Sequence, residues 1–241
     1  MNKDKTIEYY NINAEKFYNN TVGIELNDFY LKFLKYISDG GRILDLGCGS
    51  GRDTLYFIQK GYDVISMDAS EEMVKLSSEL TKRKTLFLRI EDIDFQNQFD
   101  GIWACASLLH IDKKLTESVF NILCNALRDD GVLYASYKYG KGTSILEDRY
   151  YNNYDETSFA EVIDNVNNFE IEIIDICSIC LDDITTTSIW TCKQCNTIFH
   201  KSCIEQAFNN NPTCPTCRAD ASNSSTYTTN KSLTYLSDDD D

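Results

Sequence analysis

Apolar positions in the first two thirds of the chain recur with alternating helix and strand periods. Helical spacing runs from Ile7 to Phe17 and resumes after Asn27, which we expect to cap a second helix. The apolar stripe of that helix consists of Tyr30, Phe33, Leu34 and Ile37. Gly40 and Gly41 then end it. The pattern therefore predicts two helices ahead of the first strand.

Short apolar runs and helical stretches then alternate. We expect strands at Arg42–Leu46, Asp63–Met67, Thr85–Arg89, Gly101–Cys105 and Gly131–Tyr137. Helices are expected at Thr54–Lys60, after a cap at Ser70, and at Glu117–Leu127. Alternating strands and helices predict an α/β fold, a doubly wound and mostly parallel sheet covered on both faces. Phe169–Ile176 alternates at its start and is predicted to be a sixth strand.

Composition excludes several classes of protein. The 241 residues are 42% hydrophobic and 12% aromatic, enough for one ordinary domain and a small one. No run approaches the roughly 18 apolar residues of a membrane span, and the polar start does not resemble a signal peptide, so we expect no membrane partner. The net charge of −15 argues against nucleic acid, because phosphate binding needs clustered Lys and Arg.

The ten cysteines divide into a cluster and three scattered residues. Seven lie between 177 and 217, mostly in CxxC pairs and with one His, which indicates metal ligation in a reducing compartment, cytoplasmic or nuclear. Cys48, Cys105 and Cys124 are expected to be buried as small apolar residues. Eight ligands make two closed four-coordinate zinc sites. The ligands are Cys177, Cys180, Cys192, Cys195, His200, Cys203, Cys214 and Cys217.

The cysteine-rich segment resembles the RING fingers of ubiquitin ligases. The resemblance implies a cross-brace, with one zinc held by Cys177, Cys180, His200 and Cys203 and the other by the remaining four ligands. Ile179, Pro215 and Arg218 match positions with which RING ligases bind a ubiquitin-conjugating enzyme, and Phe208 is expected to fill the groove where Ala207 replaces the usual Trp.

The same ligand order occurs in PHD fingers, which bind peptides. A PHD finger usually has an aromatic residue two positions before its last Cys pair, where this chain has Pro212. The residue choices therefore favour a RING over a PHD finger. For Ile179 and Phe208, simple packing of a small core stays an alternative.

A glycine-rich loop follows the first predicted strand and begins a helix. The run Asp45-Leu-Gly-Cys-Gly-Ser-Gly51 lets the backbone approach a ligand at a helix N-terminus, but it lacks the spacing of the dinucleotide motif. Asp68 ends the next strand, where a carboxylate can accept both hydroxyls of a ribose. The loop and this carboxylate together predict a nucleoside-containing cofactor.

These residues belong to a wider resemblance. The runs ILDLGCGSGRDT (43–54), ISMDAS (65–70), RIEDIDF (89–95) and FDGIWACASLLHI (99–111) resemble class I S-adenosylmethionine-dependent methyltransferases of the bacterial small-molecule type. The likeness extends from about residue 6 to about 176 and implies S-adenosylmethionine as cofactor. It implies that Asp45 and the glycines Gly47, Gly49 and Gly51 hold the methionine end, Asp68 the ribose, and Asp92 with the Ile93 backbone the adenine.

Candidate acceptor residues follow the fourth and fifth strands. His110, just past the fourth strand, is a candidate catalytic base, with a packed structural histidine as the alternative. Methyl transfer mainly requires alignment of the acceptor, so no base is indispensable. Arg149, Tyr150 and Tyr151 lie where the family places substrate-facing loops, although a solvated aromatic loop would have the same pattern.

The resulting organisation is a methyltransferase-like domain (1–176), a RING-type finger (177–218) and a disordered acidic tail (219–241). Members of the family complete their sheet with a seventh, antiparallel strand. Cys177 follows Ile176 directly, so this last strand is expected to be missing. We therefore expect cofactor binding with weak or absent methyl transfer.

Three functions compete at this level. The first is a RING-type ubiquitin-protein ligase with an N-terminal S-adenosylmethionine-binding domain, whose partners are a ubiquitin-conjugating enzyme and a protein target. The second is an active small-molecule methyltransferase that carries a RING, and the third is a non-catalytic, zinc-dependent peptide-binding protein. The sequence names neither the methyl acceptor nor the ubiquitination target.

Overall fold

The structure, a computed structural model, describes residues 2–138, 140–164, 166, 188–191, 198–210 and 225–228. The chain divides into two units, Met1–Ile171 and Glu172–Asp241. No helix among these described segments is long and apolar enough to cross a membrane.

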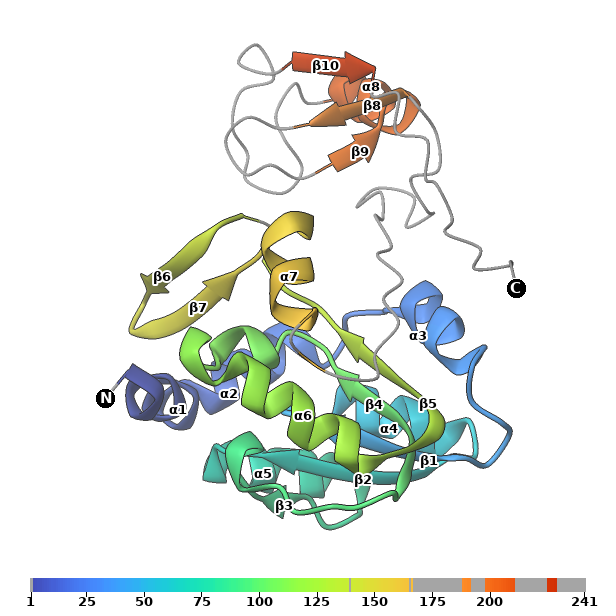
Figure 1. Ribbon diagram of the computed structural model, residues 1–241, viewed down its shortest axis with the longest axis vertical. Coiled ribbons are helices and arrows are strands. Elements are labelled where there is room, and N and C mark those ends of the chain that lie inside the picture. The colour runs from blue at the N-terminus through green and yellow to red at the C-terminus, as the bar shows by residue number, and fades with distance from the viewer. Residues whose placement is uncertain are drawn as a thin grey trace, which may run out of the picture. The chain divides into compact units, whose positions relative to one another are not determined.

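Five parallel strands form the sheet of the first unit, in the order β3-β2-β1-β4-β5 (Figure 1). Their bounds are β1 Arg42–Leu46, β2 Asp63–Asp68, β3 Leu86–Phe87, β4 Phe99–Ala104 and β5 Leu127–Ala135. In register, Ile43 lies between Val64 and Gly101. The strand order reverses between β1 and β4, the point where open parallel sheets bind ligands beyond their carboxyl ends. The predicted parallel α/β sheet is confirmed.

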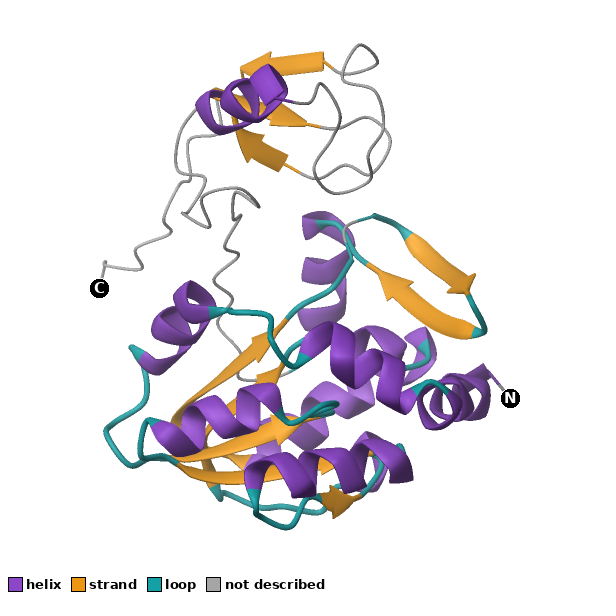
Figure 2. Cartoon of the chain, turned by 180° about the vertical axis from the view of Figure 1, so that it is seen from behind, coloured by secondary structure: helices purple, strands orange, loops and turns teal. Residues whose placement is uncertain are grey.

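Helices cover both faces of this sheet. One apolar cluster joins α3 (Asn27–Leu34) and α4 (Arg52–Gln59) to Trp103, which is fully buried. The opposite cluster joins α6 (Thr116–Ala126) and α7 (Glu156–Ile163) to the other side of β1 and β4. Figure 1 shows α6 on the near face, and Figure 2 shows the reverse side, where α4 and α5 (Glu71–Thr81) lie.

The N-terminal helices meet a hairpin from much later in the chain. Helix α1 (Asn2–Ile12) contacts both α5 and β7, and α2 (Ala14–Thr21) follows it. The hairpin consists of β6 (Gly142–Leu146) and β7 (Arg149–Asn153), with Ile145 opposite Tyr150. This corrects the expectation of a loop at 149–151. The turn of this hairpin contains no glycine. Glu147 and Asp148 adopt its left-handed φ values, 49° and 62°, where glycine or asparagine is usual, so the sequence did not predict a turn.

Two further expectations have different outcomes. Ser70 caps α5 as predicted, since its hydroxyl accepts a hydrogen bond from the Met73 N–H. Asn27 does not cap α3: the N-cap is Leu26, and the Asn27 amide donates instead to Glu25. The predicted strand Phe169–Ile176 lies outside the described residues, among which the sheet ends at β5.

In the second unit, a short antiparallel sheet has the strand order β10-β8-β9. It consists of β8 (Ser188–Thr191), β9 (Ile198–His200) and β10 (Ser225–Thr228), with α8 (Lys201–Asn210) directly after β9. Strand β10 corrects part of the predicted disordered tail. Its β-branched and aromatic residues pair with β8, with Tyr227 opposite Ile189. Residues 229–241 lie outside the described part.

Candidate cofactor and acceptor site

The glycine loop is fixed to the end of β2 by its own backbone. The N–H groups of Gly47 and Cys48 both donate to the Met67 carbonyl, at 2.9 and 3.0 Å. Gly47 has a φ of 72°, and a Cβ there would lie 2.6 Å from the Ser107 Cβ. Only glycine fits this left-handed turn against Ser107. The Ser107 hydroxyl beside it is buried and has no hydrogen-bond partner among the described residues.

Asp68 links the loop to the next helix. One carboxylate oxygen accepts from the Gly49 N–H at 2.9 Å, and the other accepts from the Ser70 N–H at 2.8 Å. Burial raises the pKa of Asp68, and the backbone donors of Ser70, Gly49 and Ala69 partly offset the shift. A carboxylate has about four acceptor sites, and these backbone donors do not fill all of them, so the carboxylate can still accept from a ribose.

Asp45 lies beneath the loop and is 2% exposed. Its carboxylate accepts the Thr54 hydroxyl from the first turn of α4, at 2.5 Å. Burial, followed by the charge of Asp53, raises the pKa of Asp45 well above its usual value. Asp45 therefore holds the start of α4 under the glycine loop, a role that the sequence alone did not indicate.

Of the candidate adenine residues, Asp92 ends the 3₁₀ turn η1 (Ile90–Asp92), which follows β3, and Ile93 comes directly after the turn. Strand β3 pairs with the end of β2, so the turn comes next to Asp68 in the fold. Asp92 is exposed, whereas the Ile93 side chain is 6% exposed and belongs to the core. The Ile93 N–H donates to the Ile90 carbonyl at a long 3.4 Å.

Sequence reasoning missed a buried ionic network beside the loop. The Asp53 carboxylate, at the start of α4, accepts hydrogen bonds from the Arg52 guanidinium, the Tyr30 hydroxyl and the Trp103 indole, at 2.5 to 3.0 Å. Burial disfavours the charge of Arg52, but the Asp53 contacts outweigh it and raise the Arg52 pKa. The network joins α3, α4 and β4. Its signal was an Arg-Asp pair directly after the last loop glycine.

His110 ends the 3₁₀ turn η2 (Leu108–His110) and is held on both sides of its ring. Nδ1 lies 2.6 Å from the Tyr150 carbonyl oxygen, and Nε2 lies 2.9 Å from the Tyr10 hydroxyl. A carbonyl can only accept, so Nδ1 carries the proton and Nε2 accepts from Tyr10. Burial lowers the pKa of His110 to about 4, against the Tyr150 hydrogen bond and with support from Arg149 and Lys138. His110 is therefore neutral at neutral pH.

Aromatic and cationic side chains surround His110. Tyr151 packs against it at 4.9 Å between ring centroids, and Lys138 Nζ lies 3.8 Å from the centre of the Tyr151 ring. The Arg149 guanidinium lies 4.4 Å from the centre of the Tyr9 ring and 5.5 Å from that of Tyr151. We call Tyr9, Tyr10, His110, Lys138, Arg149 and Tyr151 the acceptor cluster.

A line of ring contacts connects the glycine loop to the acceptor cluster. A Cβ on Gly49 would lie 3.2 Å from the Phe17 ring, which is 5.1 Å from the Tyr10 ring between centroids. The Tyr10 ring is 5.5 Å from that of His110. The N-terminal helices thus place aromatic rings between the loop and β7. Their helical spacing was visible in the sequence, but this contact was not.

Only two of the eight predicted zinc ligands lie in the described residues. His200 ends β9, and Cys203 lies in the first turn of α8 and is partly buried. The other six fall outside the described residues, as do Ile179, Pro215 and Arg218. Phe208, in α8, is partly buried. Of the three scattered cysteines, Cys48 is buried as expected, whereas Cys105 and Cys124 are only partly buried.

Comparison with protein families identifies both units. Residues 43–131 match the family model of a methyltransferase domain, and residues 175–218 match that of a ring finger domain. The chain therefore combines a methyltransferase domain with a RING zinc finger, as the resemblances implied. A methyltransferase domain implies S-adenosylmethionine, and a RING finger implies zinc.

Curated relatives match the methyltransferase domain in part. An uncharacterized methyltransferase of Staphylococcus carnosus is 25% identical over 136 residues, 54% of this chain and 66% of that protein. The glycine/sarcosine N-methyltransferase of Aphanothece halophytica is 30% identical over 118 residues, 44% of this chain and 43% of that protein. The chain thus spans less than two thirds of the length of these relatives.

Solved structures show the same fold. The 1,6-didemethyltoxoflavin-N1-methyltransferase of Burkholderia thailandensis, with bound S-adenosylhomocysteine, has a TM-score of 0.59 at 16% identity and covers 81% of this chain and 84% of its own. Phosphoethanolamine N-methyltransferase 2 of Haemonchus contortus has a TM-score of 0.57 at 19% identity, with 71% of this chain and 45% of its own covered.

Proposed function

We propose that this chain is a RING-type ubiquitin-protein ligase whose N-terminal domain binds S-adenosylmethionine. The observation that supports cofactor binding is the position of Asp68. Its carboxylate lies at the carboxyl end of β2, is anchored to the glycine loop and to α5, and retains lone pairs for a ribose. The Ser107 hydroxyl beside Gly47 is buried without a hydrogen-bond partner in the described part of the chain, which also fits a polar ligand at this edge.

The proposed assignments follow this geometry. Gly47, Gly49 and Gly51, supported from below by Asp45, hold the methionine end of the cofactor. Asp68 holds the ribose. Asp92 and the Ile93 backbone lie beside the adenine, in the turn after β3.

The ligase half rests on the ligand spacing and on the ring finger match at 175–218. Ile179, Phe208, Pro215 and Arg218 are proposed to contact the ubiquitin-conjugating enzyme. Two zinc ions hold the finger, because about 40 residues bury too little surface to fold alone.

Two measurements on the full chain test this proposal. Isothermal titration with S-adenosylmethionine should give a defined Kd, and a charged ubiquitin-conjugating enzyme should release its ubiquitin faster when the protein is added. Binding of the cofactor without any discharge across a panel of conjugating enzymes would favour the methyltransferase or peptide-binding alternatives. Release of ubiquitin without cofactor binding would indicate a ligase whose methyltransferase domain has lost its cofactor site.

An active methyltransferase is the second candidate, and the acceptor cluster is the observation that favours it. The sequence predicts that the last strand of the family is missing. Even so, α1 and the hairpin β6–β7 supply four of the six side chains of the acceptor cluster, and Phe17 connects the cluster to the glycine loop through Tyr10. When bound, S-adenosylmethionine supplies a methyl group on a cationic sulfur, so attack by an acceptor lone pair yields the methylated acceptor, S-adenosylhomocysteine and, where the attacking atom carries hydrogen, a proton.

In this candidate function His110 is a positioning residue. Its Nε2 lone pair accepts the Tyr10 hydroxyl, so the phenol is held with a fixed orientation. Burial raises the pKa of Tyr10 to about 12, and the hydroxyl stays protonated as a hydrogen-bond donor. Multiple-turnover methylation of a small molecule by the purified protein would establish this function, and its loss in His110→Ala with retained cofactor affinity would support the assigned role.

A further inference from the structure

The acceptor cluster is a cationic site in an acidic chain. Lys138 and Arg149 both lie over the Tyr151 ring, while the net charge of the protein is −15. Burial, and then the charge of Arg149, lower the pKa of Lys138, since the two cations share one environment. Neutral His110 adds no charge, and Glu147 offsets one of the two cations, which leaves a net positive charge. The local potential therefore favours an anion.

Both cations have unused hydrogen-bonding capacity. Lys138 has no carboxylate within 4 Å among the residues that the structure describes. Arg149 is paired with Glu147 at 2.8 Å through one terminal nitrogen. The guanidinium also lies within hydrogen-bonding reach of Tyr10, but its Nε is buried and has no hydrogen-bond partner among the residues that the structure describes. A buried donor without an acceptor is unfavourable, and an incoming carboxylate or phosphate would supply one.

The same contacts disfavour a cationic acceptor. The Tyr9 and Tyr151 rings, which could attract an ammonium group, already lie against Arg149 and Lys138. A second cation would meet two like charges. The Tyr9 and Tyr151 rings therefore already make cation–π contacts with Arg149 and Lys138, and a cationic ligand would have to compete with these side chains.

We infer that the methyl acceptor is a small molecule carrying a carboxylate or phosphate, which Arg149 and Lys138 bind next to the glycine loop. The inference rests on the methyl-transfer candidate for the position of the acceptor, whereas the anion site itself stands on these contacts alone. The anionic group anchors the acceptor, and a different atom of the acceptor receives the methyl group.

The test uses small probes on the full chain. Isothermal titration measures binding of malonate, inorganic phosphate, neutral malonamide and tetramethylammonium, each with and without S-adenosylhomocysteine. Malonate or phosphate should bind at least tenfold more tightly than malonamide, and the stronger of the two identifies the class of anion. Tetramethylammonium should not bind.

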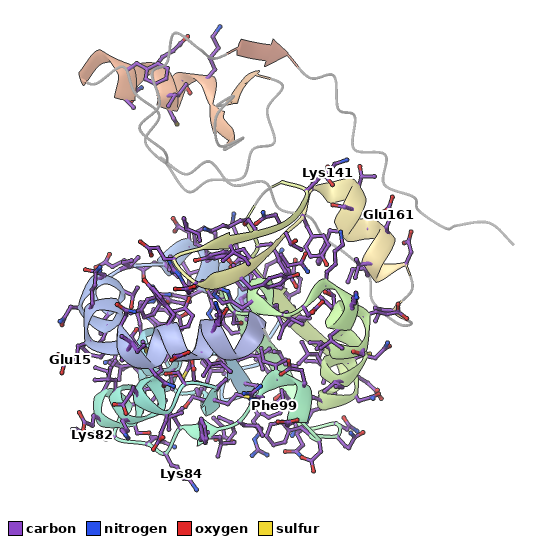
Figure 3. All side chains as sticks on the ribbon, turned by 90° about the vertical axis from the view of Figure 1, so that its left-hand side faces the viewer. Glu15, Lys82, Lys84, Phe99, Lys141 and Glu161 are labelled. Carbon is purple, nitrogen blue, oxygen red and sulfur yellow. The ribbon has the colours of Figure 1, made fainter. Side chains whose placement is uncertain are left out.

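Variants separate a specific site from general charge. Arg149→Gln and Lys138→Gln should each weaken anion binding at least fivefold. Glu147→Gln should strengthen it, because it frees the guanidinium of its present partner. Lys84→Gln removes the same charge from a side chain that points away from the domain (Figure 3) and should change nothing. Circular dichroism verifies that each variant is folded.

The outcomes are distinct. Equal binding of malonate and malonamide, preference for tetramethylammonium, or an equal loss in Lys84→Gln would overturn the inference. Binding of S-adenosylhomocysteine without any anion binding would overturn it and leave the proposed cofactor site intact. Anion binding without S-adenosylhomocysteine binding would support the anion site and refute the proposed cofactor function.

Discussion

Asp68 makes the most specific prediction at the residue scale. Its carboxylate is anchored by Gly49 and Ser70 and is proposed to accept two ribose hydroxyls. Asp68→Ala should weaken binding of S-adenosylmethionine at least tenfold, about 1.4 kcal/mol, because charge-assisted hydrogen bonds are lost. Isothermal titration measures the change. Asp129→Ala, at an exposed carboxylate, is the control and should bind normally.

The lowered pKa of His110 predicts that the stability of the protein depends on pH. Its pKa is about 4 in the folded protein and about 6.5 when unfolded, so between these values the unfolded chain binds more protons. The contribution of His110 is complete above about pH 6.5 and is lost as the pH falls toward 4. The expected loss is on the order of 2 to 3 kcal/mol.

Urea unfolding at several pH values tests this dependence against His110→Gln, which cannot titrate. The free energy of unfolding of the unmodified protein should fall more steeply between pH 6.5 and 4 than that of the variant. Parallel curves would show that His110 is not held in its neutral form by Tyr10, Tyr150, Tyr151, Arg149 and Lys138.

At the scale of elements, the network around Asp53 fixes α3 and α4 on β4. Asp53→Ala would leave Arg52 buried without its partner, which should lower the free energy of unfolding by about 3–5 kcal/mol. Tyr30→Phe keeps the ring and removes one hydrogen bond to a charged group, so its cost should be about 1.5–3 kcal/mol. Denaturant unfolding measures both. Similar values for the two variants would contradict a buried ion pair.

The sequence predicted elements best where one local signal dominates. Strand β1 and the cap of α5 were correct because a short apolar run between glycines, and Ser70 before Glu71 and Glu72, leave few alternatives. The hairpin β6–β7 was missed, since its turn uses Glu147 and Asp148 where glycine or asparagine is usual. Leu26 replaced Asn27 as the N-cap without any side-chain hydrogen bond, so packing outweighed the local capping preference.

The candidate site was predictable only where its residues lie on neighbouring strands. Asp68 and the glycine loop are adjacent through neighbouring parallel strands, a relation that periodicity reveals. Tyr10 meets His110 across 100 residues of sequence, and Arg149 contacts Tyr9 from still farther along the chain. No local signal encodes such a contact, because it depends on how α1 packs against the hairpin.

For the whole molecule, the ligand spacing predicts two zinc ions per chain. A chelator should unfold the finger and leave the methyltransferase domain helical, because metal binding supplies the folding free energy of the small unit but contributes nothing to the larger core. Elemental analysis gives the metal ratio, and circular dichroism follows the helices during chelation. A ratio near one would refute the cross-brace assignment.

Ubiquitin transfer should depend on the finger alone. Ile179 and Arg218 lie next to predicted zinc ligands in the sequence without being ligands, so Ile179→Ala and Arg218→Ala should keep two zinc ions and still lose discharge of ubiquitin from its conjugating enzyme. A loss of metal together with activity would show only that the finger had unfolded. The Asp68→Ala variant should promote discharge normally, since Asp68 belongs to the other unit. If the unmodified protein is active and the Ile179→Ala variant promotes discharge of ubiquitin equally well, Ile179 does not contribute to binding of the conjugating enzyme. A zinc-dependent peptide-binding function would then explain the finger better.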